Sequence, residues 1–263
     1  MSLETGFLQV KLLSMMMERA DVEKNLAIRK MLLQKIIYLS RKIAAGASGI
    51  KKTVVTQYRP GLDELEVDRT LEAQIGSPIL DYENIYCHER IKQKSSYVLM
   101  FDVSNSMHQE KIMVGAIATG VFASKLCHDF YGVLTFAREA SFLKHVTEPN
   151  DLVTLMDKML DIKSGGTTNI REALLKGLEQ LNESKTMSKT GIIVTDGWST
   201  VGGDPVEVAA KYDRLHVLGI SFGIGGSDPK TNFQMAKKGK GRYMYVRKYD
   251  DLPIAITKIL TNK

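Results

Sequence analysis

The hydrophobic positions of the chain follow two different patterns, which change near residue 95. From about Leu8 to Ala45, apolar side chains recur at helical spacing among lysine, arginine and glutamate, without a proline or glycine, which predicts one or two helices. From Ser96 onward, short β-branched runs alternate with amphipathic segments, a pattern typical of a parallel sheet wrapped by helices. We therefore expect a helical N-terminal extension with a linker over residues 1–95 and an α/β domain over residues 96–263.

The α/β region is expected to form a doubly wound, Rossmann-like, mostly parallel sheet of six strands with helices on both faces. The predicted strands are Tyr97–Val103, Tyr131–Phe136, Ala140–Lys144, Gly191–Thr195, Leu215–Phe222 and Tyr243–Val246. The predicted helices are Glu110–Cys127, Asp151–Leu160, Ile170–Leu181, Pro205–Tyr212, Thr231–Lys238 and Asp250–Leu260. In such folds, ligands bind beyond the carboxyl ends of the strands, so the loops there are the first place to look for a site.

The region before residue 96 contains further elements. The sequence predicts a linker at residues 46–52, an extended segment at Val54 and Val55, a turn at Pro60 and Gly61, and a short acidic helix over residues 62–75. The first helices carry a methionine-rich face, which suits either core packing or partner binding. The residues leave open whether these helices pack against the sheet, bind a partner or bind a second copy.

Composition narrows the class of protein. The chain has 263 residues, 44% of them hydrophobic, and can bury a sizeable core. Lysine and arginine exceed the acids by six, but the only dense basic run is residues 237–242, so no nucleic-acid partner is expected. Two cysteines fit a reducing compartment. A signal peptide and an apolar run of membrane-spanning length are both missing from the sequence, so we expect a cytoplasmic protein without a membrane segment.

Three oxygen-rich loops are expected at the strand ends where ligands bind in such a fold. The first loop carries Asp102, Ser104 and Ser106, whose side chains can converge because alternate residues of an extended backbone project the same way. The second is Ser164–Asn169, where two glycines allow a close turn before a helix. The third is Thr195–Gly197, with Asp196 at its centre.

The three loops offer hydroxyls and carboxylates but neither imidazole nor thiolate. This donor set suits Mg²⁺, Mn²⁺ or Ca²⁺ and is poorly suited to zinc or copper. Because hydroxyls outnumber carboxylates, a cation held there keeps uncompensated positive charge. It also keeps a coordination position for water or for a carboxylate from outside, which binds strongly where water is excluded.

With these loops in view, residues 96–263 resemble a von Willebrand factor type A (VWA) domain, and the loops resemble its metal-ion-dependent adhesion site (MIDAS). The resemblance implies Ser104 and Ser106 as direct ligands, Thr168 as a ligand in at least one state, and Asp102 and Asp196 as acids bound directly or through water. Thr168 is preferred to Thr167 because its spacing into the following helix matches the family. We expect the rim of the site to contact a partner through Asn105, His108, Thr167 and Trp198.

A narrower resemblance concerns the segment before the domain. Residues 59–62 (Arg-Pro-Gly-Leu) and 69–72 (Arg-Thr-Leu-Glu) look like the N-terminal extension of prokaryotic intracellular members of the family. Those members are similar to the magnesium-chelatase D subunit and to proteins that work beside AAA+ ATPases of the MoxR type. This implies such an ATPase, or its client, as partner and a role in metal insertion or complex maturation. The chain has no phosphate-binding loop of its own.

Enzyme alternatives are weaker than an interaction module. Residues 219–223 match the hydrolase pattern G-x-S-x-G, but Ser221 lies within a predicted strand and no histidine follows His216. A metal-dependent hydrolase using the same cation is the main alternative. It would need more carboxylates and a positioned base, for which His108 is the nearby candidate. The Cys87-His88 and Cys127-His128 pairs lack zinc-site spacing and predict core cysteines beside surface histidines. We therefore expect no enzymatic activity.

Overall fold

The computed structural model describes residues 3–19, 22–45, 52–62, 64–76, 82–91, 94–104, 109–220 and 228–261. The chain divides into two compact units. One comprises Met1–Ala47 with Lys94–Lys263, and the other comprises Ser48–Gln93; we call them the sheet unit and the small unit. The N-terminal helices therefore belong to the same unit as the sheet. Among the described helices, none has both the length and the apolar character that crossing a membrane requires.

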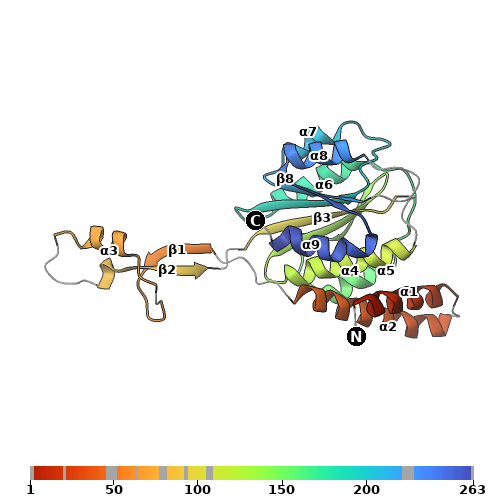
Figure 1. Cartoon of the computed structure of the whole chain (residues 1–263), viewed down its shortest axis with the longest axis horizontal. Helices are drawn as coiled ribbons and strands as arrows, with labels where there is room; N and C mark the ends of the chain where they lie inside the picture. Colours follow the sequence, from red (N-terminus) through yellow and green to blue (C-terminus); the bar gives the residue numbers. More distant parts are fainter. Residues whose placement is uncertain are drawn as a thin grey trace. The chain divides into compact units, whose positions relative to one another are not determined.

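The sheet unit contains a six-stranded sheet in the order β5-β4-β3-β6-β7-β8; its strands β3 and β8 are labelled in Figure 1. Only β5 runs antiparallel to its neighbour β4; the other pairs are parallel. The strands are β3 Ser96–Asp102, β4 Phe130–Phe136, β5 Ala140–Lys144, β6 Lys189–Thr195, β7 Leu215–Ile220 and β8 Lys240–Val246. The predicted α/β class and all six strands are confirmed. The last two residues of the predicted strand Leu215–Phe222 lie outside the described residues.

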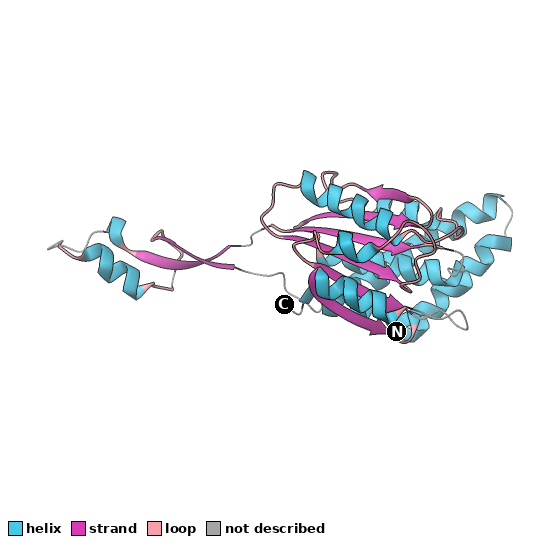
Figure 2. Cartoon of the chain, turned by 90° about the horizontal axis from the view of Figure 1, so that it is seen from above, coloured by secondary structure: helices cyan, strands magenta, loops and turns pink. Residues whose placement is uncertain are grey.

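Helices cover both faces of this sheet, as Figures 1 and 2 show. One face carries α6 Ile170–Glu183, α7 Pro205–Ala209 and α8 Pro229–Lys238, and the other carries α4 Gln109–Lys125, α5 Leu152–Leu160 and α9 Leu252–Thr261. Successive residues of β3 alternate between the two cores: Leu99 and Phe101 belong to the α4 side, whereas Val98 and Met100 belong to the α6 side. All four are fully buried, which is why the strand reads as a continuous apolar run.

The N-terminal helices, α1 Leu3–Arg19 and α2 Val22–Ala44, form a hairpin that packs on α4 and α5. Leu32, Ile36 and Leu39 of α2 are buried in the same core as α4. The Ser40 hydroxyl donates to the Ile117 carbonyl at 3.1 Å. A side chain at Gly120 would collide with Ser40, so glycine at this position permits the close approach of α2 and α4. The methionine-rich hairpin is thus partly a core element.

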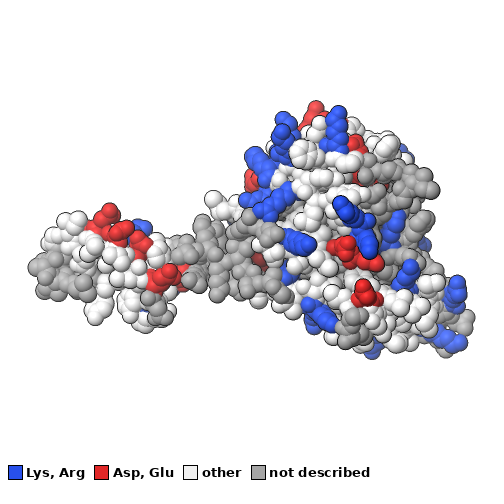
Figure 3. All heavy atoms as spheres, in the orientation of Figure 1, with Lys and Arg blue, Asp and Glu red and all other residues white. Residues whose placement is uncertain are grey.

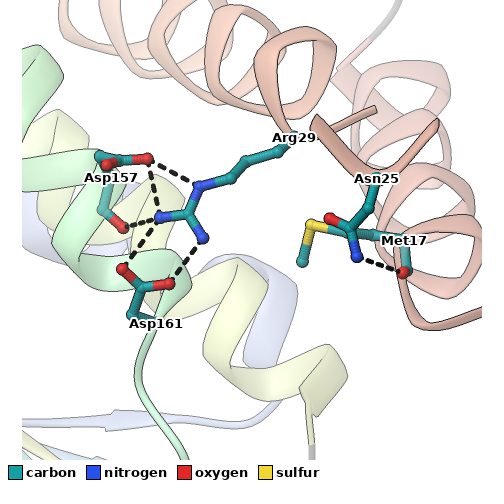
Figure 4. Close-up of polar contacts among 5 residues, drawn as sticks. All are labelled: Met17, Asn25, Arg29, Asp157 and Asp161. Atoms are coloured by element: carbon teal, nitrogen blue, oxygen red, sulfur yellow. Dashed lines mark hydrogen bonds and ion pairs between the residues drawn. The ribbon is translucent and has the colours of Figure 1, made fainter. Parts of the chain in front are cut away.

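An ionic contact anchors α2 to the end of α5 (Figure 4). The Arg29 guanidinium donates to Asp157 Oδ1 at 2.8 Å and to both Asp161 carboxylate oxygens at 2.6 and 2.9 Å. It also donates to the Asp157 carbonyl at 3.0 Å. Asn25 closes the turn of the hairpin by donating from Nδ2 to the Met17 carbonyl at 3.1 Å. Asp161 begins the segment that leads to the second of the oxygen-rich loops.

The small unit is a two-stranded antiparallel sheet with a short helix. Its elements are β1 Lys52–Gln57, α3 Val67–Gln74, η1 Tyr82–Asn84 and β2 Tyr86–Ile91. The extended segment and acidic helix predicted here are confirmed, although the helix begins at Val67. Strand β2 was not predicted, because its sequence, Tyr-Cys-His-Glu-Arg-Ile, lacks a run of apolar residues. Cys87 in β2 is buried, whereas Cys127 is exposed; the prediction that both are core cysteines was wrong for Cys127.

Candidate metal-binding site

The first carboxylate of the site, Asp102, ends strand β3 and is only 2% exposed. Its Oδ1 accepts a hydrogen bond from the Ser104 backbone N–H at 3.0 Å, and its Oδ2 accepts one from the Thr195 hydroxyl at 2.9 Å. Both partners lie at the carboxyl ends of neighbouring parallel strands, because β3 pairs with β6. Each carboxylate oxygen retains acceptor capacity after these bonds, so the group can still bind a cation.

The second carboxylate, Asp196, follows strand β6 directly and is 8% exposed. The Trp198 N–H donates to Asp196 Oδ1 at 2.9 Å, and the Gly197 N–H donates to the Thr195 hydroxyl at 3.1 Å. Gly197 has φ of 84°, a conformation that other residues rarely adopt. A Cβ there would lie 2.7 Å from the Asp228 carbonyl and from Asn232 Nδ2. Glycine is therefore required for the turn that orients Asp196.

Backbone hydrogen bonds bring the second loop to the other two. The Thr168 N–H donates to the Thr200 hydroxyl at 2.9 Å, and the Thr200 N–H donates back to the Thr168 carbonyl at 2.9 Å. The Gly165 N–H donates to the Val103 carbonyl at 3.0 Å. Thr168 is 5% exposed, whereas Thr167 is exposed on the surface. This difference in burial agrees with the preference for Thr168 as the ligand.

Burial makes the two carboxylates costly to keep charged without a counter-ion. Desolvation raises the pKa of Asp102 to about 6, and the charge of Asp196 adds to this effect. Desolvation also raises the pKa of Asp196, against the opposing effects of the Trp198 N–H and the Lys111 ammonium. Partial burial lowers the pKa of Lys111, and the negative charge of Asp196 acts in the opposite direction. Among the described residues, the site thus combines two buried acids with the nearby ammonium of Lys111.

Lys111 was missed by the sequence reasoning. It lies in the first turn of α4, the helix that follows the Asp102–Ser106 loop. The available signal was its position, since the start of a helix that leaves a binding loop lies beside that loop. The acid whose charge acts on Lys111 is Asp196, which is remote from it in the sequence, so only the fold brings the two side chains close.

The structure therefore brings together four of the predicted ligand residues: Asp102, Ser104, Thr168 and Asp196. Ser106 and the rim residues Asn105 and His108 lie outside the described residues. Of the other rim residues, Thr167 is exposed in the second loop and Trp198 is 54% exposed beside Asp196. In the described part of the chain, no three His, Cys, Asp or Glu side chains gather as a metal cluster. The donor set is two carboxylates with hydroxyls, which fits a hard divalent cation.

Comparison with known proteins identifies the family. The family model of the von Willebrand factor type A domain matches residues 98–258. The chain belongs to the von Willebrand factor type A domain family. The matched VWA region contains the four predicted ligand residues that the structure brings together, as well as Lys111. VWA domains are generally MIDAS-bearing modules for protein interaction and are usually not catalytic. No curated protein matches the chain.

Solved VWA-like structures share the fold at low sequence identity. BatB from Bacteroides thetaiotaomicron, a conserved hypothetical protein, has a TM-score of 0.53 and 20% identity, with 63% of this chain and 97% of that chain covered. An aerotolerance-related membrane protein from Bacteroides fragilis has a TM-score of 0.50 and 20% identity, covering 64% and 100%. Proximal thread matrix protein 1 from the mussel byssus, with a zinc-occupied MIDAS motif, has a TM-score of 0.55 and 16% identity, covering 64% and 47%.

Proposed function

We propose that this VWA protein is a divalent-cation-dependent interaction module that binds an acidic side chain of a partner protein. The observation that supports the proposal is the buried carboxylate of Asp102, which lies beside a second acid at the end of the neighbouring strand. Two acids this poorly hydrated are stabilised in their charged form by a cation. The hydroxyls of Ser104 and Thr168 supply uncharged oxygen ligands at the same edge of the sheet.

The residues that would hold the cation are Asp102, Ser104, Ser106, Thr168 and Asp196. Mg²⁺ is the proposed ion, with Mn²⁺ and Ca²⁺ as alternatives of the same ligand class. When bound, the cation supplies a positive centre that accepts a partner's aspartate or glutamate. Thr167 and Trp198, with Asn105 and His108, would form the rim against which the partner packs. The exposed indole of Trp198 is an effective contact because it buries a large apolar area.

The identity of the partner is a separate proposal, which rests on the sequence resemblance alone. We propose a MoxR-type AAA+ ATPase or its client, acting with this chain in the cytoplasm during metal insertion or complex maturation. A partner captured by the metal site should be released by a chelator and by an excess of free acidic peptide. An ATPase captured regardless of metal would bind elsewhere on the chain.

The first test is a metal titration of the full chain. Trp198 is the only tryptophan and adjoins Asp196, so its fluorescence and the heat of binding should both report Mg²⁺ or Mn²⁺. We expect saturable binding in the parent protein, loss of binding in Asp102→Ala and Ser104→Ala, and no change in Glu179→Gln. Glu179 is an exposed acid near the far end of α6, so it controls for the loss of a negative charge.

The outcomes distinguish a site that needs an outside carboxylate to bind metal from a site that does not bind metal at all. If the parent binds no metal even at millimolar concentration, the titration is repeated with an acidic peptide, whose carboxylate would complete the coordination shell. Binding only in the presence of the peptide would support the proposal. Absence of binding in both conditions, or binding that survives Asp102→Ala, would refute the site.

A further inference from the structure

The outer face of the α1–α2 hairpin carries an apolar groove of about 620 Å³. Leu12 and Met16 of α1 and Met31 and Tyr38 of α2 line it, and each of these side chains is slightly more than half exposed. Contiguous exposed apolar side chains of this kind mark an interaction surface. Methionines adapt their shape to an incoming side chain. The opposite face of the same hairpin is buried against α4 and α5, so the groove is not the face that holds the hairpin in place.

The groove has a basic border. Lys35 lines it, with its ammonium 5.7 Å from the centroid of the Tyr38 ring. Arg41 and Lys42 follow one turn beyond Tyr38, and Arg19 follows one turn beyond Met16. Residues 3–45 contain eight Lys and Arg against four Asp and Glu. Charge and shape together favour an acidic amphipathic helix as the occupant.

The small unit presents such a helix. Val67, Leu71 and Ile75, spaced four residues apart along α3 and its C-cap, are 52%, 62% and 83% exposed. The opposite side of α3 faces the strands, where Thr70 is buried and its hydroxyl accepts the Tyr86 N–H at 2.9 Å. An apolar stripe at this spacing is the arrangement by which a helix enters a groove.

The helix of the small unit also has the charge that the groove requires. Residues 62–83 contain seven Asp and Glu and a single basic residue, Arg69, whose guanidinium lies 4.7 Å from the centroid of the Tyr86 ring. Asp68 and Glu72, next to the apolar stripe, are exposed. On the face drawn in Figure 3, acidic side chains outnumber basic ones on the small unit, and basic ones predominate on the sheet unit.

The position of α3 within the small unit keeps it away from the chain connections. The chain enters and leaves the β1–β2 pair at the end where Lys52 pairs with Ile91, whereas α3 is bonded at the other end, where Gln57 pairs with Tyr86. Six-residue strands span about 20 Å. The β1–β2 pair therefore acts as a spacer that presents α3 at a distance from its own attachment.

We propose that α3 of one copy of this chain docks in the α1–α2 groove of a second copy. The stripe Val67, Leu71 and Ile75 enters between the two helices, and Asp68 and Glu72 face the basic border. The occupant is a second copy because one chain carries both complementary surfaces, the groove and the acidic helix, and α3 is held at the end of a spacer. The contact joins two different surfaces, so reciprocal exchange closes a twofold dimer, whereas one-way docking continues into a longer chain.

The test uses two variants of the full chain, each disabling one surface. Met16→Asp places an acid in the groove, and Leu71→Asp interrupts the apolar stripe. Leu26→Asp is the matched control, since Leu26 is an equally apolar, 73% exposed residue of α2 that does not line the groove. Sedimentation velocity from about 1 to 100 µM covers the range in which contacts of modest size dissociate. Circular dichroism and thermal unfolding establish that each variant is folded.

We expect the parent and Leu26→Asp to associate with rising concentration, and each of the other two variants to associate at least about tenfold more weakly. An equimolar mixture of Met16→Asp and Leu71→Asp should regain association, because one intact helix then meets one intact groove. A parent that stays monomeric throughout overturns the proposal, as does a mixture that fails to associate. Association that a chelator abolishes would also overturn it, because the contact would then involve the metal site.

Discussion

Replacing Arg29 by methionine tests whether the N-terminal hairpin is an integral part of the sheet unit. Methionine keeps the apolar stem of the side chain but removes every ionic contact to α5. Arg29 is 23% exposed, while the side chains of Asp157 and Asp161 are 48% and 65% exposed, so solvent screens both pairs. Such pairs contribute about 0.5 kcal/mol each, and the hydrogen bond to the Asp157 carbonyl adds about 1 kcal/mol. We expect Arg29→Met to lower the free energy of unfolding by about 2 kcal/mol.

A second substitution, Arg29→Lys, separates charge from geometry. The guanidinium engages both oxygens of Asp161 and two atoms of Asp157 at once, which a single ammonium cannot do. Arg29→Lys should therefore recover no more than about half of the loss. Urea unfolding followed by Trp198 fluorescence measures the sheet unit, and hydrogen exchange of the α2 amides measures the hairpin.

The contact between Arg29 and Asp161 should also make the stability loss in Arg29→Met depend on pH. Arg29 lowers the pKa of Asp161 in the folded protein. The stabilisation is therefore present above the unfolded value of about 3.9 and is lost as the pH falls through the lower, folded value. The gap between parent and Arg29→Met should shrink at low pH. Equal unfolding midpoints and equal α2 exchange for the two proteins at neutral pH would refute the reasoning, and so would a lysine variant that matches the parent.

Three other substitutions probe the site and the sheet. Gly197→Ala should weaken metal binding about tenfold or more, because a Cβ at φ of 84° collides with the Asp228 carbonyl and shifts Asp196; a metal titration that matches the parent would contradict the requirement for glycine. Lys111→Met should tighten metal binding by about two- to tenfold, because it removes a positive charge near Asp196. A metal titration followed by Trp198 fluorescence checks this. Weaker binding than in the parent would show that Lys111 supports the site in another way. Burial lowers the pKa of His216 to about 4 in the folded protein, whereas the unfolded value is about 6.5. As the pH drops from about 6.5 to 4, the unfolded chain therefore binds a proton that the folded protein does not, and the free energy of unfolding should fall by about 3 kcal/mol. The Arg242 N–H donates to His216 Nδ1 at 3.0 Å, and the Oδ1 of an asparagine in His216→Asn can accept the same hydrogen bond. The free energy of unfolding of His216→Asn, measured in urea, should vary less with pH than that of the parent. An unchanged pH profile would exclude His216 as the cause.

The sequence predicted where the candidate site should lie because the fold obeys a simple rule. Parallel strands end at one edge of a sheet, so the loops that follow Asp102 and Thr195 were expected at the same edge. The direct pairing of their strands, β3 and β6, was decided by the structure. The apolar runs of those strands are unambiguous because both faces of the sheet are buried. The choice of Thr168 over Thr167 also followed from spacing, and the burial of Thr168 agrees with it. The roles of these residues as ligands remain predictions.

Other features depended on contacts between distant parts of the chain. Helical periodicity identifies the apolar face of α2 but does not specify which surface it meets, so the docking on α4 through Ser40 and Gly120 was not predictable. Arg29 and Asp161 are 132 residues apart in the sequence. From the sequence alone, a charged residue on a helix is predicted to be solvent-exposed, and its ionic partner becomes known only from the fold. The proximity of Lys111 to Asp196 has the same origin.

From residue 96 onward, the sequence by itself determined the succession of strands and helices along the chain and the chemical character of the loops between them, because both depend on local periodicity and residue type. Only the tertiary structure decided which faces are covered. One side of the α1–α2 hairpin is buried, and the other carries an apolar groove with a basic border. The tertiary structure also separated residues 48–93 as a unit with its own exposed acidic helix. Burial of a given side chain is a property of the neighbours that the whole fold supplies, and a linear pattern does not contain them.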